Sequence, residues 1–393
     1  MNWLYFVALR YLTSRHKEKF ISIISMISIL GIAVGVAALI VVISVMSGFD
    51  NDLKEKIIGM NAHLVVESDY GVNSSQDFIG KILEVQHVVA ASPYLHGQAL
   101  VRSNENATGV VVKGIESSGE EKISKIKAYL TQGSLDFDQD GIVIGNELAS
   151  KLKLRLGDKV TIVSPSYTKG MTLKVCGIFT SGMYEYDMNF VFVGLKKAQE
   201  LFAISGLVSG IGIKIDDAFN AGDVKRELLR KLGPAFIVRT WMEQNKNLLA
   251  ALKLEKTVMF LILTLIVIVA CLNIASTLIM TVLEKTKDIG ILKSIGASNN
   301  NVMVLFAIEG GMIGLLGTAL GTALGVALCW CLKTYRFISL PQDIYYIDKL
   351  PVKLDPQDIL VIVLSSILIS LLATIYPAYK ASKLDPVEAL RYE

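Results

Sequence analysis

Four long apolar runs divide this chain, and each is long enough to cross a bilayer as a helix. A helix rises about 1.5 Å per residue, so about 20 apolar residues span the hydrocarbon core. The pattern therefore predicts membrane-spanning helices over residues 21–47, 257–283, 302–332 and 359–378. Residues 48–256, between the first two spans, contain no such run and have the composition of a water-soluble domain.

The segment from Ala62 to Arg239 alternates short β-rich runs with helical patterns. The runs AHLVVES and ATGVVVKGI predict strands, and SSQDFIGKILEVQ predicts a helix capped by Ser74 or Ser75. DGIVIGNELASKLKLRLGDKVTIVSP predicts strand, helix, turn and strand, and NAGDVKRELLRKLGPAFIVRT predicts a last helix and strand. The predicted fold class is therefore membrane α-helical, with four transmembrane helices and a large α+β domain inserted between the first and second spans.

No glycine or proline occurs from Met242 to Leu283, which allows a single helix of about 60 Å. The bilayer core accounts for only about 30 Å of that length. We expect the rest to stand outside the membrane as a helical stalk, with Trp241, Leu248 and Leu252 on its packing face. SGFDNDLKEKIIGM, after the first span, is its expected partner. Two separate helices joined by a bend are the alternative.

Aromatic side chains in residues 1–20 are typical of an interfacial helix at the lipid headgroups. A cleaved signal peptide is the alternative, but the first apolar run is longer than a signal core of about 7–15 residues. Lysine and arginine gather in residues 1–20, 284–301 and 379–393, which predicts that these segments are cytoplasmic. The large domain and the loop 333–358, which is also basic, then lie on the opposite side.

Composition and candidate chemistry argue against an enzyme. The chain is 52% hydrophobic and 19% charged with a net charge of +3, which favours a membrane protein. Its four cysteines and four histidines show no disulfide framework, metal spacing or catalytic constellation. Asp136, Asp138, Asp140, Gly141 and Glu147 match a calcium-loop spacing, but a predicted strand and helix flank them, which favours an acidic surface turn. No Walker A sequence occurs, so no ATP hydrolysis by this chain is expected. Separately, no cofactor, no metal and no nucleic-acid partner are expected.

Glycines follow one face of the third predicted span at helical spacing, which lets another helix approach closely. The stripe comprises Gly310, Gly314, Gly317, Gly321 and Gly325. Gly31 and Gly35 give the first span a similar face. Packing between helices, within or between subunits, is favoured over a channel lining. Glu309 lies inside the same span, and both proton coupling and pairing with a neighbour are open roles for it.

The short charged segment EKTKDIGILKSIGAS separates the second and third spans. It predicts a helix that Gly296 ends, with Ser298 capping the next helix. Its apolar arc comprises Ile289, Ile291, Leu292 and Ile295, and the opposite arc contains Lys287, Gly290, Lys293 and Ser294. An exposed apolar arc of this kind binds either a protein groove or the lipid surface.

Several motifs resemble the permeases of MacB- and FtsX-type ABC transporters. They are EKTKDIGILKSIGAS, the glycine stripe behind IEGGMIG, and the tail YPAYKASKLDPVEALRYE. SVMSGFDNDLKEKI, DIYYIDKLP and the ending ALRYE resemble the LolC/LolE lipoprotein-releasing permeases within that group. The likeness covers essentially the whole chain. It implies a multi-pass protein of a bacterial inner membrane, with cytoplasmic termini and a periplasmic large domain.

The resemblance implies a transport subunit rather than an enzyme. Such permeases pair with a second permease or a second copy, and they bind two copies of a LolD-like ATPase that holds ATP and Mg²⁺. Residues 284–301 would be the coupling helix. The residues implied at the ATPase are Ile289, Ile291, Leu292, Lys293, Ile295 and Gly296. A triacylated lipoprotein would leave the phospholipid membrane for a LolA-like periplasmic carrier.

The resemblance also assigns substrate contacts. Met46 matches a family position near the lipoprotein cavity, and Tyr345 and Tyr346 match a substrate-contacting loop before the last span. LolC-like members grip the carrier with a long proline-containing hook, whereas SPSYTKGMTLKV is a very short turn. That turn is LolE-like and the ALRYE ending is LolC-like, so carrier docking by this subunit stays open. An FtsX-like regulator of a wall hydrolase and a MacB-like export permease are the alternative functions.

Overall fold

The computed structural model describes residues 6–7, 19–103, 106–137, 140–335 and 350–385. It contains two compact units, called the helical unit and the sheet unit below. The helical unit comprises Met1–Asp50, Leu252–Ile338 and Lys349–Glu393, and the sheet unit comprises Asn51–Ala251 and Ser339–Asp348. The predicted interfacial helix at residues 1–20 and the ALRYE ending fall almost wholly outside the described residues.

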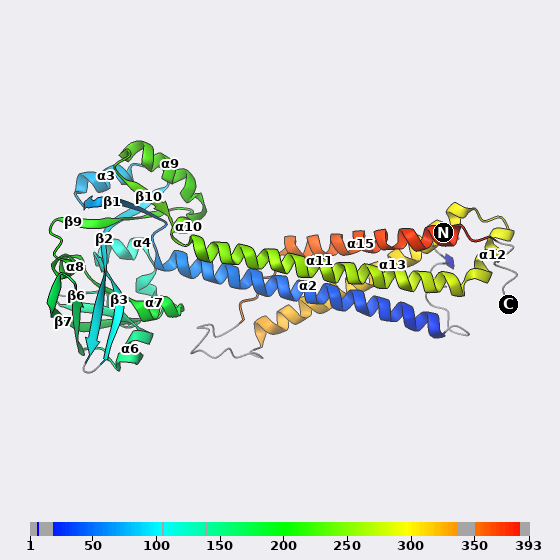
Figure 1. The fold of residues 1–393 in the computed structure, drawn as a ribbon, viewed down its shortest axis with the longest axis horizontal. Helices are drawn as coiled ribbons and strands as arrows, with labels where there is room; N and C mark the ends of the chain where they lie inside the picture. The colour runs from blue at the N-terminus through cyan, green and yellow to red at the C-terminus, as the bar shows by residue number, and fades with distance from the viewer. Residues whose placement is uncertain (1–5, 8–18, 104–105, 138–139, 336–349, 386–393) are drawn as a thin grey trace. The chain divides into compact units, whose positions relative to one another are not determined.

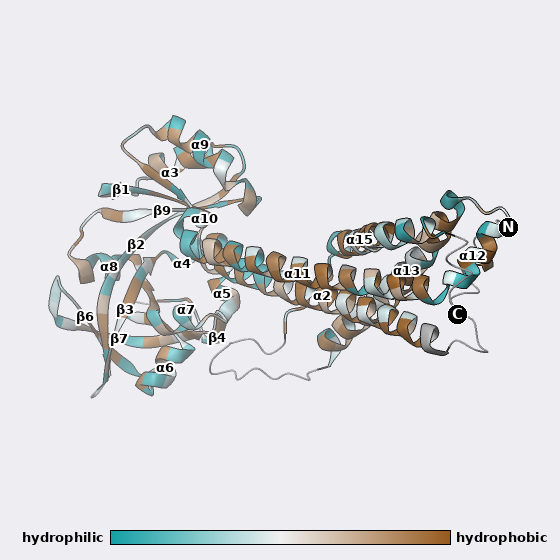
Figure 2. Ribbon diagram, turned by 45° about the vertical axis from the view of Figure 1, so that its right-hand side comes forward, coloured by the Kyte–Doolittle hydropathy of each residue, from teal (hydrophilic) through white to brown (hydrophobic). Residues whose placement is uncertain are grey.

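Long helices build the helical unit (Figure 1). They are α2 Lys19–Met60, α11 Lys246–Glu284, α13 Asn299–Thr334 and α15 Pro356–Ser382, and the short α12, Thr286–Ser294, lies between α11 and α13 in the chain. Among the described residues, four helices are long and apolar enough to cross a membrane, which confirms the four predicted spans. Figure 2 shows the apolar residues running along these helices.

α13 and α15 begin before the predicted spans because local capping, rather than hydropathy, sets their first residues. The Ser298 hydroxyl accepts a hydrogen bond from the Asn301 N–H at 3.2 Å and starts α13. Asp355 caps α15 by accepting from the Gln357 N–H at 3.0 Å, with Pro356 in the first turn. The predicted start at Met242 of the long second helix is wrong, because the backbone leaves the helical conformation at Asn245. Residues Trp241–Gln244 form the separate α10 there.

The glycine stripe of α13 packs mainly against two helices of this chain, α15 and α2. A Cβ added at Gly310 or Gly314 would lie 2.1 Å from Thr374 Cγ2 or 2.4 Å from Ser370 Cβ, both on α15. Gly317, Gly321 and Gly325 face α2 instead, and a Cβ at Gly321 would lie 2.6 Å from the Ala33 carbonyl oxygen. The predicted close approach of helices is therefore confirmed within the chain. Gly31, predicted to act similarly, faces Asn273 of α11 at 2.9 Å.

Gly321→Val is expected to lower the thermal unfolding midpoint of the detergent-solubilised protein. The new side chain would meet the Ala33 backbone, which cannot rotate away, so α13 must move off α2 at a cost of about 1–3 kcal/mol. Gly311→Val is the matched control in the same helix, since its Cβ would meet only the flexible end of Leu371 at 3.3 Å. Equal midpoints for the two variants would contradict the packing role.

A ten-stranded mixed sheet forms the sheet unit, in the order β10-β1-β9-β2-β3-β8-β5-β7-β4, with β6 paired to β2 and β7. The pairs β3 with β8 and β5 with β7 are parallel, and the others are antiparallel. The strands are β1 Leu64–Asn73, β2 Val88–Ser103, β3 Asn106–Ile115, β4 Leu130–Gly133, β5 Gly141–Gly145, β6 Lys159–Ser164, β7 Tyr167–Phe179, β8 Phe190–Gly194, β9 Leu207–Ile215 and β10 Ile237–Thr240.

Short helices connect the strands and cover the sheet. They are α3 Gln76–Leu83, α4 Ser117–Ile123, α5 Ile126–Tyr129, α6 Asn146–Leu152, α7 Tyr184–Asn189, α8 Leu195–Phe202, the 3-10 helix η1 Ala218–Asn220 and α9 Ala221–Leu232. α3 begins after Ser75, whose hydroxyl accepts from the Phe78 N–H at 3.3 Å, as the sequence predicts. Gly157, at φ +92°, makes the predicted turn before β6. The predicted α+β alternation is therefore confirmed.

Two clusters of buried side chains hold the sheet unit together. The larger includes Leu64, Val112 and Ile213, and the smaller includes Phe179 and Phe192, whose rings meet edge to face at 5.4 Å. Trp241 of α10 is buried in the larger cluster, and its indole N–H donates to the Ala218 carbonyl at 2.8 Å. That anchoring explains why the chain turns at Asn245 before α11 begins.

Candidate functional site

The segment α12 is a short helix with defined ends between two long ones. Gly296 adopts φ +102°, a conformation that favours glycine, directly after the helix. The Ala297 N–H donates to the Leu292 carbonyl at 2.9 Å and the Gly296 N–H to the Lys293 carbonyl at 3.0 Å, which closes the last turn. The predicted stop at Gly296 and the predicted cap at Ser298 are both confirmed.

The apolar residues of α12 divide between two faces. Ile289 is fully buried in a cluster with Val302 and Phe306 of α13, whereas Ile291 and Ile295 are 52% and 77% exposed and Leu292 is half-buried. The prediction of one exposed arc is therefore wrong for Ile289. At about 100° per residue, Ile291 and Ile295 stand about 40° apart, while Ile289 is about 160° from Ile291. The free apolar surface consists of Ile291 and Ile295.

Lys293 connects α12 to the end of α15. Its ammonium donates to the carbonyl oxygens of Ser382 and Leu384, each at 2.7 Å. Those carbonyls lie at the C-terminal end of α15, where backbone acceptors lack intrahelical partners and a positive charge is favourable. Lys293 therefore fixes the position of α12 instead of presenting a free charge, which the sequence did not predict.

The loop before α15 is held against α2 beside Met46. The Lys353 N–H donates to the Ser44 carbonyl of α2 at 3.0 Å. A Cβ at Gly48 would lie 2.0 Å from the Pro351 carbonyl oxygen, so only a glycine leaves room for this backbone. Met46 lies half-buried between these two contacts along α2. Tyr345 and Tyr346, predicted to contact substrate from the same loop, lie outside the described residues.

An ion pair joins α2 and α11 at Asp50, two residues after Gly48. Lys256 Nζ lies 2.9 Å from Asp50 Oδ2, and the Asp50 side chain is only 10% exposed. No sequence motif marked Gly48, Asp50 or Lys256 for these contacts, and Lys353 counted only as a basic residue of its loop. A glycine inside a predicted helix, in SVMSGFD, was the available signal for the close contact at Gly48.

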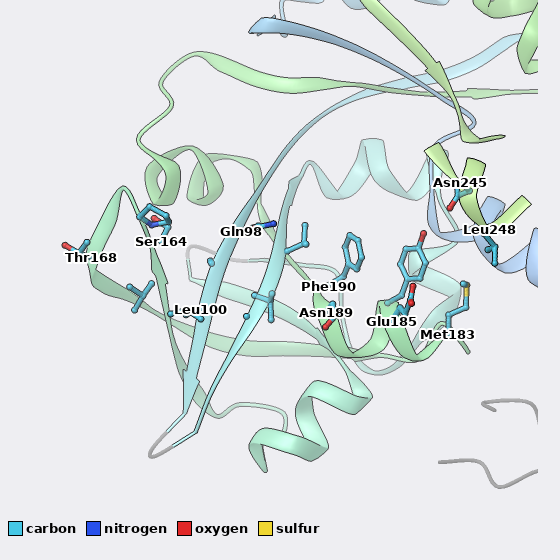
Figure 3. Close-up of a pocket in the computed structure, with 17 residues that line it drawn as sticks. Gln98, Leu100, Ser164, Thr168, Met183, Glu185, Asn189, Phe190, Asn245 and Leu248 are labelled. Atoms are coloured by element: carbon cyan, nitrogen blue, oxygen red, sulfur yellow. The ribbon is translucent and has the colours of Figure 1, made fainter. Parts of the chain in front are cut away.

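The sheet unit contains an open groove of about 1080 Å³ (Figure 3). Its floor is one face of β2 and β3 with the exposed Leu100, and Phe190, Met183 and Leu248 add apolar walls. The turn between β6 and β7 lies at one end of the groove and contains two residues, because Ser164 pairs with Tyr167. The very short turn that the sequence predicts in place of a hook is confirmed.

A second, smaller pocket of about 380 Å³ in the sheet unit is charged but internally paired. The Tyr94 hydroxyl donates to Glu67 Oε1 at 2.8 Å, and Lys113 Nζ donates to Glu120 Oε1 at 2.8 Å. Burial, with the nearby Glu67 charge, raises the pKa of Tyr94, so the phenol stays neutral and donates its proton. These contacts neutralise the pocket from within and lock β1, β2, β3 and α4 together.

The acidic stretch from Asp136 to Glu147, which matches a calcium-loop spacing, lacks the flanking helices of a calcium motif and contributes an ion pair instead. Asp140 pairs with Lys197 at 3.0 Å, and β5 followed by α6 replaces the second helix of a calcium motif. Asp138 lies outside the described residues. Within the described ranges, no three His, Cys, Asp or Glu side chains come together in a way that could hold a metal ion.

Comparison with known proteins agrees with this architecture. Residues 25–231 match the MacB-like periplasmic core domain, and residues 260–386 match the FtsX-like permease C-terminal region. The lipoprotein-releasing system transmembrane protein LolC of Xylella fastidiosa is 35% identical, over 98% of each chain. LolE of Haemophilus influenzae is 29% identical over 99% of each chain.

Among solved structures, the periplasmic region of MacB from Actinobacillus actinomycetemcomitans covers 49% of this chain and 95% of its own, at 13% identity and a TM-score of 0.34. A likeness at that level carries no argument by itself. The full-length match to LolC is much stronger. This chain therefore belongs to the LolC/LolE family of lipoprotein-releasing permeases, within the MacB/FtsX superfamily, and has four membrane-spanning helices with a periplasmic α+β domain between the first two.

Proposed function

We propose that this chain is the permease subunit of a transporter that extracts lipoproteins from the inner membrane and passes them to a periplasmic carrier. The observation that carries the proposal is the pair Ile291 and Ile295, which stays exposed on a helix otherwise anchored by Ile289 and Lys293. An anchored helix with a free apolar face suits docking into a protein groove. Its place between two spans suits a partner at the cytoplasmic surface.

That partner is a LolD-like ATPase. The chain has no Walker A sequence, so we assign ATP and Mg²⁺ binding to two ATPase copies, one for each permease of a dimer. The second permease is either another copy of this chain or a related subunit. Membership of the ABC permease superfamily supports a transport subunit without its own catalytic site.

Movement would pass from α12 to the periplasmic domain through long helices. The helix α2 contains 42 residues and α11 contains 39, about 60 Å each, which is twice the thickness of the bilayer core. Stiff helices of this length can act as the predicted stalks. The basic segments 284–301 and 379–393 favour cytoplasmic α12 and a cytoplasmic C-terminus.

The lipoprotein would lie near Met46, where the loop before α15 contacts α2. The names of the relatives, lipoprotein-releasing system transmembrane proteins, support this class of substrate. The two-residue turn between β6 and β7 leaves no long hook, so we do not assign carrier docking to that turn. The FtsX-like and MacB-like alternatives have less support, because neither is the family of the full-length relatives.

A photo-crosslinking experiment tests the substrate assignment. A photoprobe at Met46 in the assembled complex is expected to form an adduct with the acyl chains of a bound lipoprotein. The adduct should disappear when ATP and the carrier are added. A probe at Leu368, which is 59% exposed on α15, is the control for random contact within the membrane. No adduct at Met46, or equal adducts at both positions, would contradict the proposal, as would correct lipoprotein sorting after depletion of the protein.

A further inference from the structure

One face of the β2–β3 ladder in the sheet unit is open and apolar (Figure 3). β2 lies between β9 and β3 in the sheet, so this face does not belong to an unpaired edge. The exposed residues along this part of β2 alternate with buried or half-buried ones and are His96, Gln98, Leu100 and Arg102. An antiparallel sheet ordinarily faces water through polar side chains, whereas Leu100 is 52% exposed in the floor of a groove of about 1080 Å³. A hollowed apolar face of this kind indicates a binding site.

The register of β2 and β3 places the two pockets of the sheet unit in one row. The directly opposite pairs are His96 with Lys113, Gln98 with Val111, and Leu100 with Gly109. Opposite residues of an antiparallel pair point to the same face, and successive pairs on that face are about 6.8 Å apart. The first pair lines the smaller pocket, and the other two line the larger groove. Tyr186, Phe190 and Asn245 line both, so the two form one site, called the β2–β3 trough below.

Gly109 leaves a gap in the floor of this trough. A Cβ added there would meet nothing within 4 Å, although the opposite residue, Leu100, is a large apolar side chain. The floor therefore alternates between raised and hollow positions along the ladder. An extended polypeptide fits such a floor, because its side chains on one face are also about 6.8 Å apart.

The wall of the trough that α7 contributes is held rigidly. The Tyr186 and Phe190 rings stack with their centroids 4.9 Å apart, and Asn61 Nδ2 donates to the Tyr186 hydroxyl at 2.6 Å. Asp187 is fully buried behind them, and its Oδ1 accepts from the Ser181 N–H at 2.8 Å and the Ser181 hydroxyl at 2.7 Å. Because these contacts fix α7 and the turn before it, a partner finds the wall already formed and loses little entropy by ordering it.

Unused polar groups in the trough indicate the chemistry of its partner (Figure 3). Gln98 and Asn189 line the larger groove, and among the described residues their side-chain amides make no hydrogen bond. An amide carries both donors and an acceptor, which matches the backbone N–H and C=O groups of a peptide. Glu185 is the one charged residue among the described residues that line this groove, and it has no ion pair within them. An unpaired carboxylate favours a basic side chain nearby.

We propose that the β2–β3 trough binds the polypeptide of the lipoprotein substrate, as an extended segment with apolar side chains and a basic residue near Glu185. The inference rests on the proposed function and extends it from the acyl chains to the polypeptide. Leu248, in the wall of the trough, belongs to α11, and the predicted span begins in the same helix at Thr257, nine residues further along the chain. A polypeptide whose acylated end lies in the membrane emerges beside such a helix, which favours the substrate as the occupant.

A photoprobe at Leu100, in the complete complex with bound lipoprotein, tests this assignment. We expect an adduct with the polypeptide of the lipoprotein, located by mass spectrometry near its acylated end. Val89, which is 62% exposed in the same strand and outside the trough, is the control position. The inference would be overturned by the absence of a polypeptide adduct at Leu100, by an adduct with the carrier or a second copy of this chain in its place, or by equal adducts at Leu100 and Val89.

Two substitutions in the trough test its shape and its charge separately. Gly109→Trp places an indole in the gap, and we expect the Leu100 adduct to fall about tenfold with an unchanged thermal unfolding midpoint. Gly222→Trp is the matched control on α9, because its Cβ also meets nothing within 4 Å, and it should keep the wild-type yield. Glu185→Lys reverses the charge and should lower the yield about threefold, as expected for an exposed ion pair.

The outcomes separate this inference from the proposed function. Wild-type adduct yields in both Gly109→Trp and Glu185→Lys would contradict binding in the trough, even where the Met46 probe still forms its acyl adduct. Absence of the acyl adduct at Met46 in the wild-type complex would instead contradict the proposed function.

Discussion

Ile291→Asp and Ile295→Asp are each expected to abolish ATPase binding while leaving membrane insertion intact. The two side chains are 52% and 77% exposed, so replacing them removes little of the folded core. Transfer of an isoleucine side chain into a groove contributes about 1.5–3 kcal/mol, and a carboxylate in the same groove would be desolvated without a partner. We expect affinity to fall by at least about a hundredfold, which corresponds to about 2.8 kcal/mol.

The measurement is a titration of purified ATPase against the detergent-solubilised permease, with protein yield in membranes recorded for each variant. Asn300→Asp is the matched control, because it adds the same charge at an exposed position in the first turn of α13 without removing an apolar side chain. It should bind the ATPase like the wild type. Unchanged affinity in Ile291→Asp and Ile295→Asp would contradict docking to the ATPase and would support the alternative, in which α12 lies on the lipid surface.

Ile289 shows which part of this site the sequence could predict. The end of α12 and the start of α13 depend on local chemistry, namely a glycine with positive φ and a serine cap, and both are readable from the chain. The choice of face is different, because apolar residues at 289, 291, 292 and 295 surround much of a short helix. Ile289 is buried because α12 packs into a cluster that includes Val302 and Phe306, which the helix's own sequence does not specify. The same applies to Lys293, whose carbonyl partners lie 89 and 91 residues away.

The glycines of α13 show the same limit for the membrane-spanning helices. Their spacing predicts a close approach, because it depends on the geometry of one helix. It does not predict that Gly310 and Gly314 face α15 while Gly317, Gly321 and Gly325 face α2. Partner identity depends on how neighbouring helices cross α13. Hydropathy likewise located the spans but not their ends, since α2 stays helical through polar residues up to Met60.

Gly48→Ala is expected to lower lipoprotein release strongly without weakening ATPase binding at α12. The added Cβ would lie 2.0 Å from the Pro351 carbonyl oxygen and 2.5 Å from its carbonyl carbon. These are backbone atoms, so no side-chain rotation relieves the overlap, and the loop must leave α2. The bond from the Lys353 N–H to the Ser44 carbonyl, at 3.0 Å, would be lost with it. Overpacking of this kind costs about 1–3 kcal/mol, or roughly 5- to 150-fold in an equilibrium.

Helix propensity alone predicts the opposite effect, because alanine is favoured over glycine inside a helix by about 1 kcal/mol. Gly48→Ala should therefore stabilise an isolated α2, and any loss must come from the displaced loop. Gly35→Ala supplies the matched control in the same helix, since its Cβ would meet Ile266 Cγ2 at an ordinary 3.8 Å. Release from vesicles should fall for Gly48→Ala and stay normal for Gly35→Ala, with equal ATPase binding in both. Normal release in Gly48→Ala would mean that the contact beside Met46 is structural packing and not part of the path that a lipoprotein follows.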